Sequence, residues 1–267
     1  MEFSDGDIVS NLTDEKDATV TLYAVWSLTE EFLEREYKKG DRLYTSIPAH
    51  VTRAVLTGVR GDLYPNARIV VAQRTLPLTI ELRDVYAVGQ RGNDGGMNVE
   101  GSAGSPVISM GTNNARVPDL TIISVGASNR LVGGAGGNGG KGTTGTLTKR
   151  PGVGKRAGNG MTAIIADKVT IIGDITLSGG NGGEGGRSGD KGAYMGDGNA
   201  GGNGGNGGTP LDANKLTVHD TVIVYGGKGG LGGVKWNGGA LPPGGRAGSG
   251  KDGTFTLKYD GPGTVLR

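Results

Sequence analysis

The chain has 267 residues, of which 56 are glycine and none is cysteine, and its formal net charge is +2. The lack of cysteine excludes a disulfide framework and thiolate metal sites. The small net charge, with acids and bases interspersed, gives no basis for nucleic-acid binding, and no run of about eighteen apolar residues is present to span a membrane. Only four glycines precede residue 89, so the chain divides into an ordinary β-rich part and a part whose backbone is dictated by glycine.

The first predicted element is a strand over residues 19–26, in which apolar side chains alternate along one face. This strand ends a segment that reads GDIVSNLTDEKDATVTLYAVW. The segment, from about residue 3 to residue 26, resembles the closing half of the Listeria–Bacteroides repeat, a small β module of internalin B-type bacterial surface proteins. The resemblance implies that residues 1–27 are part of such a repeat and that the chain is a piece of a longer surface protein. The alternative is an unrelated pair of strands.

Residues 28–77 are predicted to form a connector that contains one short helix and several strands. Residues 28–39 carry acidic side chains early and Lys38 and Lys39 late, and Gly40 follows, which is a helix pattern. Turn-prone dipeptides then separate three predicted strands, at 43–47, 50–58 and 67–73.

Residues 78–267 are predicted to form a glycine-rich repeat domain. Residues 166–183 align without a gap on residues 213–230, an offset of 47. Similar apolar-Thr-apolar segments begin near residues 78, 120, 169 and 216, and residues 254–259 form a last strand that could close a sheet edge. A fixed period of this length indicates a stacked array in which each unit needs its neighbours to bury its surface.

The glycine tracts repeat as Gly-Gly-Xaa, and they cover residues 133–141, 179–187, 201–209 and 226–234. A period of three is that of polyproline II, which has no internal hydrogen bonds, so the backbone groups must pair between neighbouring helices. The tracts are therefore predicted to be ordered helices and not flexible linkers. Six Xaa residues are predicted to face solvent: Asn181, Glu184, Arg187, Asn203, Asn206 and Thr209. Three are predicted to face another layer: Ala135, Leu231 and Val234.

The predicted fold class is therefore all-β, with short-strand repeats in a solenoid or layered sheet combined with packed polyglycine-II helices in the C-terminal two-thirds. This combination resembles the polyglycine-II sandwich of T-even phage long-tail-fibre tip adhesins. In composition it resembles mycobacterial glycine-rich repeat proteins and a glycine-rich antifreeze protein. These resemblances imply a non-catalytic extracellular framework whose connecting loops contact a receptor, although no loop motif matches and no binding residue is carried over.

Three segments interrupt the triplets, at residues 143–158, 185–199 and 234–246, and they are predicted to be hairpin tips. Aromatic and basic side chains on a stiff frame suit ligand capture. The candidate ligand-contacting residues are Lys149, Arg150, Lys155, Arg156, Tyr194, Met195, Lys235 and Trp236. The alternative is that Tyr194 and Trp236 only cap the glycine lattice where it ends.

No catalytic, cofactor or metal motif is recognised in the sequence. Each Gly-Lys pair lacks the following Ser or Thr of a phosphate loop. Asp94, Asp190 and Asp197 fit no calcium repeat and are interpreted as turn residues, while His50 and His219 lie in different strands without further zinc ligands. We therefore expect no enzymatic activity, no cofactor and no metal site.

The predicted function is that of a non-catalytic extracellular module of a larger bacterial surface protein. It would act in adhesion or as a rigid spacer, and its partner would be a protein or glycan receptor on a host or bacterial cell. The predicted location is the bacterial cell surface. Two alternatives remain open: a phage tail-fibre tip adhesin, located on the virion, and an ice-binding protein.

Overall fold

The computed structural model describes residues 31–267, with the exception of residues 112, 191, 194–198, 236–243 and 247. These residues belong to one compact unit that begins at Glu31. The predicted surface repeat at residues 1–27, with its strand at 19–26, lies outside the described residues.

Short strands assemble into three parallel sheets, which share strands β4 and β10. Sheet A contains β1 (Glu31–Glu36), β3 (Val51–Thr57), β5 (Leu78–Arg83), β8 (Val117–Val125), β10 (Ile164–Ile172), β13 (Lys215–Val218) and β17 (Tyr259–Asp260). Sheet B contains β2 (Tyr44–Ile47), β4 (Leu63–Val71), β7 (Ile108–Met110), β10 and β12 (Leu211–Asp212). Sheet C contains β4, β6 (Tyr86–Gly89), β9 (Arg130–Val132), β11 (Ile175–Ser178), β14 (Thr221–Tyr225) and β18 (Thr264–Leu266). The chain visits sheets B, A and C in turn, so this part of the molecule is a parallel β-solenoid, and the all-β prediction is confirmed.

The solenoid is held together by apolar side chains that alternate along each strand. In β8, for example, Leu120 and Ile122 are fully buried, whereas the side chain of Thr121 between them is half-buried. Leu120 pairs with Leu78 on one side and with Val169 on the other, so equivalent positions in successive turns of the solenoid stack on one another. Inward-facing residues of all three sheets form one continuous core, and removal of this apolar surface from water stabilises the stack.

The register of the sheets follows the repeat found in the sequence. The four predicted unit starts, residues 78, 120, 169 and 216, occupy equivalent positions, because Leu78 pairs with Leu120, Leu120 with Val169, and Val169 with Leu216. The offset of 47 residues also relates Ile175 to Val222 in sheet C. The internal repeat therefore predicted the strand pairing correctly.

The helix predicted at residues 28–39 is wrong, because Glu31–Glu36 is strand β1 and pairs in parallel with β3. Leu33 and Tyr37 pack against the core from this strand and the residue that follows it. The charge pattern favoured a helix, but the open edge of sheet A supplies hydrogen bonds and apolar contacts that override so weak a local preference.

The three other strands predicted in the connector are present as β2, β3 and β4, and they join the same sheets as the later strands. The sheets thus extend without a break across residue 78, where the repeat domain was predicted to begin. The last strand, predicted at residues 254–259, begins only at Tyr259. This strand, β17, pairs with β13 in a register that places Tyr259 opposite Leu216. A separate strand, β18, follows it.

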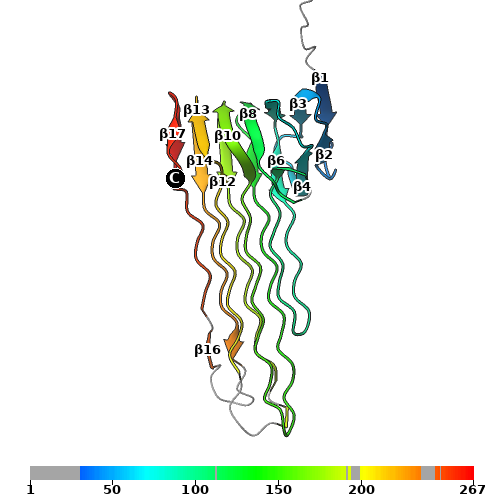
Figure 1. Cartoon of the computed structure of the whole chain (residues 1–267), viewed down its shortest axis with the longest axis vertical. Helices are drawn as coiled ribbons and strands as arrows, with labels where there is room; N and C mark the ends of the chain where they lie inside the picture. The colour runs from blue at the N-terminus through cyan, green and yellow to red at the C-terminus, as the bar shows by residue number, and fades with distance from the viewer. Residues whose placement is uncertain (1–30, 112, 191, 194–198, 236–243, 247) are drawn as a thin grey trace, which may run out of the picture. The chain divides into compact units, whose positions relative to one another are not determined.

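Four times in the described chain, the backbone leaves sheet C, runs away from the solenoid and returns (Figure 1). We call residues 90–98, 133–142, 179–190 and 226–235 the outgoing segments. Residues 99–106, 152–162, 200–209 and 248–253 are the returning segments. Figure 1 shows that the first excursion turns back closer to the solenoid than the later ones.

Backbone hydrogen bonds between these segments recur at every third residue. Within the outgoing layer, the amides of Gly136 and Gly139 donate to the carbonyl oxygens of Asn181 and Glu184, both at 2.8 Å. Between the layers, Gly183 N donates to Gly158 O at 3.0 Å and Gly186 N to Lys155 O at 2.8 Å. The backbone groups of the glycine tracts therefore pair between neighbouring segments, as expected for a conformation without internal hydrogen bonds.

The close packing explains why glycine predominates at two of every three positions. A Cβ atom on Gly136 would lie 2.0 Å from Gly158 O in the returning layer. A Cβ atom on Gly137 would lie 1.9 Å from Asn93 O in the neighbouring outgoing segment. At positions such as these two, a side chain has no room.

The N–H group at the third position is bonded by asparagine or aspartate side chains, which the sequence analysis did not anticipate. The Asn181 side-chain oxygen accepts from Lys228 N at 2.9 Å, and the Asn138 oxygen accepts from Glu184 N at 2.9 Å. Equivalent bonds join Asn159 to Asn206 N, Asn206 to Lys251 N, and Asp94 to Asn138 N. These four asparagines, Asn138, Asn159, Asn181 and Asn206, therefore each bond their segment to the next one.

Side-chain exposure at the third positions matches most of the predictions. The six residues predicted to face solvent, Asn181, Glu184, Arg187, Asn203, Asn206 and Thr209, are all exposed. Leu231 was predicted to face another layer, and this is wrong because its side chain is 49% exposed. The row that contains it lies on the outer face of the outgoing layer, which no other segment covers in the described part of the chain. Ala135 and Val234 are half-buried.

Candidate functional site

The end of the glycine bundle that is remote from the solenoid contains the first candidate site. We define the tip as residues 143–151 together with Asp190, Gly192, Ala193 and Asn199. Gly145 N donates to Asp190 O at 2.8 Å, and Gly189 N donates to Gly152 O at 2.9 Å just behind the tip. The Asn199 side-chain amide donates to Pro151 O. The described residues of the second and third excursions therefore lie side by side at this end of the bundle.

The tip presents an apolar residue beside two cations. Residues 146–149 form a tight turn in which Thr146 N donates to Lys149 O at 2.9 Å and Lys149 N donates to the Thr146 hydroxyl at 3.1 Å. In this turn Leu147 is 76% exposed. Lys149 and Arg150, which follow it closely in the chain, are also exposed. Sequence reasoning missed Leu147, although an isolated apolar residue in the middle of a segment that interrupts the triplets was an available signal.

Only two of the eight predicted ligand-contacting residues belong to the described tip, namely Lys149 and Arg150. Lys155 and Arg156 lie on a returning segment, where Lys155 N donates to Gly140 O at 2.9 Å and Gly101 N donates to Arg156 O at 3.0 Å. Lys235 is half-buried in β15 (Val234–Lys235), which pairs with β16 (Gly244–Arg246) in an antiparallel hairpin. Tyr194, Met195 and Trp236 lie outside the described residues.

The tip half of the bundle has an excess of positive charge although the whole chain is nearly neutral. Residues 141–156 contain five Lys or Arg residues and no Asp or Glu. Asp190, on the neighbouring outgoing segment, forms an ion pair with Lys141. The hydrogen bond from Lys141 lowers the pKa of Asp190 below its usual value, so this acid stays ionised and offsets Lys141. Lys149 and Arg150 are the exposed cations of the tip itself.

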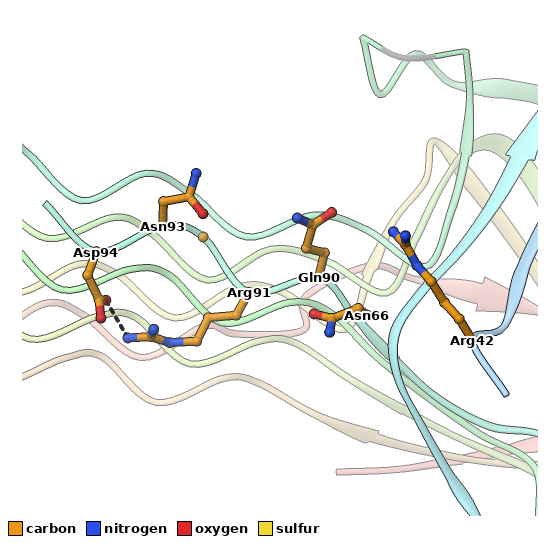
Figure 2. A pocket seen from close by; sticks show the side chains of 7 residues that line it. Arg42, Asn66, Gln90, Arg91, Asn93 and Asp94 are labelled. Atoms are coloured by element: carbon orange, nitrogen blue, oxygen red, sulfur yellow. Dashed lines mark hydrogen bonds and ion pairs between the residues drawn. The ribbon is translucent and has the colours of Figure 1, made fainter. Parts of the chain in front are cut away.

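A second candidate site lies at the other end of the bundle, where the first outgoing segment leaves the solenoid. Its cavity has a volume of about 460 Å³ and is lined by Arg42, Asn66, Gln90, Arg91, Gly92, Asn93 and Asp94. We call this cavity the notch. Figure 2 shows Arg42 at one end and Asn93 and Asp94 at the other, with Gln90, Arg91 and Asn66 between them. Sequence analysis assigned Asp94 to a turn and did not identify this site.

One wall of the notch is fixed by an ion pair. Arg91 Nη2 lies 2.6 Å from Asp94 Oδ1, and the same oxygen accepts a hydrogen bond from Asn138 N at 2.6 Å. The hydrogen bond from the Arg91 guanidinium contributes most to lowering the pKa of Asp94, and the hydrogen bond from the Asn138 amide lowers this pKa further. Asp94 is therefore an ionised structural group, and the other polar side chains are the ones available to a ligand.

The described residues contain no group of three or more His, Asp or Glu side chains placed to hold a metal ion. In the same part of the chain, no helix is long and apolar enough to cross a membrane.

Comparison with known proteins gives little further information. No protein-family model matches the sequence, and no curated protein matches it. A solved structure with some similarity is a nine polyproline type II helical bundle, the springtail antifreeze protein from Granisotoma rainieri. It is 25% identical over 63% of this chain and 95% of its own length, with a TM-score of 0.15. A TM-score of this size establishes no common fold.

Proposed function

We propose that the chain is a non-catalytic extracellular adhesion module, in which a rigid glycine bundle holds a cationic tip away from the solenoid. The observation that carries the proposal is the position of Lys149, Arg150 and the exposed Leu147 at the remote end of the bundle. The helices that support them are hydrogen-bonded both within and between layers. A polyglycine-II helix rises about 3.1 Å per residue, so residues 133–142 span roughly 30 Å.

The charge of the tip supports an anionic partner. Exposed cations steer an oppositely charged surface and raise its association rate, and a neighbouring exposed leucine adds apolar contact area. A cell-surface receptor that carries carboxylate, sulfate or phosphate groups, on a glycan or a protein, would satisfy both features. The rigid frame lowers the entropy cost of binding because the tip is already ordered.

The test is adhesion of the full-length chain to bacterial and epithelial cells, compared with the Lys149→Ala/Arg150→Ala variant. We expect the variant to bind at least about tenfold less at physiological salt, and we expect wild-type binding to weaken as salt increases. Lys168→Ala is the control, because Lys168 is exposed on the solenoid and far from the tip in sequence. Equal binding by the tip variant and the wild type would contradict adhesion through the tip and leave the spacer role as the better interpretation.

The other proposals differ in their partners. A phage tail-fibre tip would use the same cationic surface on a bacterial receptor, and binding confined to bacterial cells would favour it. Ice binding has less support, because the exposed rows of the bundle mix Asn, Glu, Arg and Lys side chains.

A further inference from the structure

The notch exists because the solenoid begins before the glycine bundle does. Strands β2, β3 and the start of β4 lie in sheets B, A and C, and β4 then continues directly from sheet C into sheet B, without an excursion. Ala67, in the middle of β4, pairs with Gly89 at the start of the first excursion. Arg42 and Asn66, on the solenoid, therefore lie beside the edge of the first outgoing segment that no other described segment covers. The notch is the cavity between these two residues and the outgoing segment.

Two of the side chains in the notch, those of Gln90 and Asn93, occupy positions that are glycine in the later outgoing segments. The hydrogen-bond register makes Gln90 equivalent to Gly134 and Asn93 equivalent to Gly137. A Cβ atom on Gly134 would lie 2.0 Å from Gln90 O, and one on Gly137 would lie 1.9 Å from Asn93 O. Gln90 and Asn93 are thus tolerated only because no further helix packs beside the first segment. By the same geometry, they prevent another glycine helix from packing there.

Several polar groups in the notch have no partner among the described residues. The carbonyl oxygens of Arg91 and Asp94 accept no hydrogen bond there, although the equivalent oxygens of Ala135 and Asn138 accept from Gly92 N at 2.8 Å and from Gly95 N at 2.7 Å. The side-chain amides of Asn66, Gln90 and Asn93 are likewise unpaired within the part of the chain that the structure describes. The Arg42 guanidinium lies over the ring of Tyr44, 5.5 Å from the ring centroid.

We propose that the notch binds a neutral saccharide. Three amides, two carbonyl oxygens and one guanidinium offer donors and acceptors side by side, and adjacent sugar hydroxyl groups each both donate and accept. The cavity of about 460 Å³ is open and polar, which suits a hydrated sugar better than an apolar ligand. The single carboxylate, Asp94, is already bonded to Arg91 and Asn138, so a cation is a poor fit. The proposal does not depend on the tip.

The experiment is saturation-transfer NMR of the full-length chain with methyl glycosides of glucose, galactose, mannose, fucose and N-acetylglucosamine. We expect saturation transfer to at least one of these sugars. The Gln90→Gly/Asn93→Gly variant, which restores the residues of the bundle interior, should bind it about tenfold more weakly, as expected for two lost hydrogen bonds. Gln73→Ala is the control, because Gln73 is an exposed amide outside the notch, and it should bind as the wild type does.

A second variant covers the possibility that the glycine substitutions disturb the first segment. Asn66→Gly removes an amide from the solenoid side of the notch and keeps the positive φ of 55° at that position accessible. This variant should also weaken binding, whereas Lys149→Ala/Arg150→Ala should leave sugar binding unchanged, which separates the notch from the tip. Absence of saturation transfer to any of the five sugars would overturn the proposal, as would unchanged binding in both notch variants.

Discussion

The solenoid and the glycine bundle keep the same register by different forces. In the solenoid, Val169 and Leu216 are paired and buried in a continuous apolar core. In the bundle, the same offset of 47 residues joins Asn181 to Lys228 N through a side-chain hydrogen bond. The bundle between sheets and tip buries almost no large apolar side chain among the described residues. Its cohesion comes from backbone bonds and from the close approach that glycine allows.

This difference has a consequence for how the two regions respond to change. Hydrophobic stabilisation scales with the buried area and is lost with each removed methyl group. A lattice of hydrogen bonds is distributed over many weak contributions of about 1 kcal/mol each. Single side-chain deletions should therefore destabilise the solenoid strongly and the bundle only locally.

The largest effect is expected for Leu120→Ala in the solenoid core. Leu120 is fully buried and stacks between Leu78 and Val169. Truncation leaves a cavity, and we expect a loss of about 3 kcal/mol in the free energy of unfolding, measured by chemical denaturation. Val125→Ala is the matched control on the same strand, because Val125 is 45% exposed, and it should change stability by less than about 0.5 kcal/mol. Similar losses in the two variants would contradict a core between the sheets.

A smaller effect is expected for the buried carboxylate Glu81 on sheet A. Glu81 accepts bonds from Arg53 Nη2 at 2.8 Å and Arg83 Nε at 2.7 Å. The hydrogen bond from Arg53 contributes most to lowering the pKa of Glu81, and it outweighs burial, which raises this pKa. A carboxylate with a lowered folded-state pKa stabilises the fold above its unfolded pKa of about 4.3, and this contribution is lost as pH falls through the folded value.

Glu81→Gln should therefore cost about 1–2 kcal/mol at pH 7, and less below about pH 4. The cost stays below that of a fully buried ion pair because the side chains of Arg53 and Arg83 are 40% and 45% exposed and can hydrate. Urea denaturation between pH 3 and pH 7 measures it, with the exposed Glu100→Gln as the control. A difference between Glu81→Gln and wild type that does not change with pH would contradict an ionised Glu81.

Much of this architecture could be predicted from the sequence, because the repeat encodes the register directly. The offset between Val169 and Leu216 in the aligned repeats is also their pairing in sheet A. The triplet period likewise predicted that the glycine tracts pair with one another, and only glycine fits at positions such as Gly137. These features are set by local spacing, which a sequence displays.

The notch and the role of β1 could not be predicted in this way. Gln90 and Asn93 look like ordinary polar residues until the register shows that they replace interior glycines. The segment Glu31–Glu36 has a helix-like charge pattern, and only the open edge of sheet A makes it a strand. Both features depend on where the lattice or the sheet ends, which is a tertiary property.

The smallest effect is expected for Asn181→Ala in the bundle. The Asn181 oxygen accepts from Lys228 N at 2.9 Å on an exposed face, so water can replace the lost bond and the cost should be about 0.5–1 kcal/mol. Hydrogen exchange of the Lys228 amide should accelerate several-fold, while amides of the solenoid core keep their protection. Asn203→Ala is the control, because Asn203 is equally an exposed third-position residue, but its side-chain oxygen accepts from no amide among the described residues. If both variants exchange alike at residues 226–234, asparagine does not fasten the helices, and glycine packing with backbone bonds alone defines the bundle.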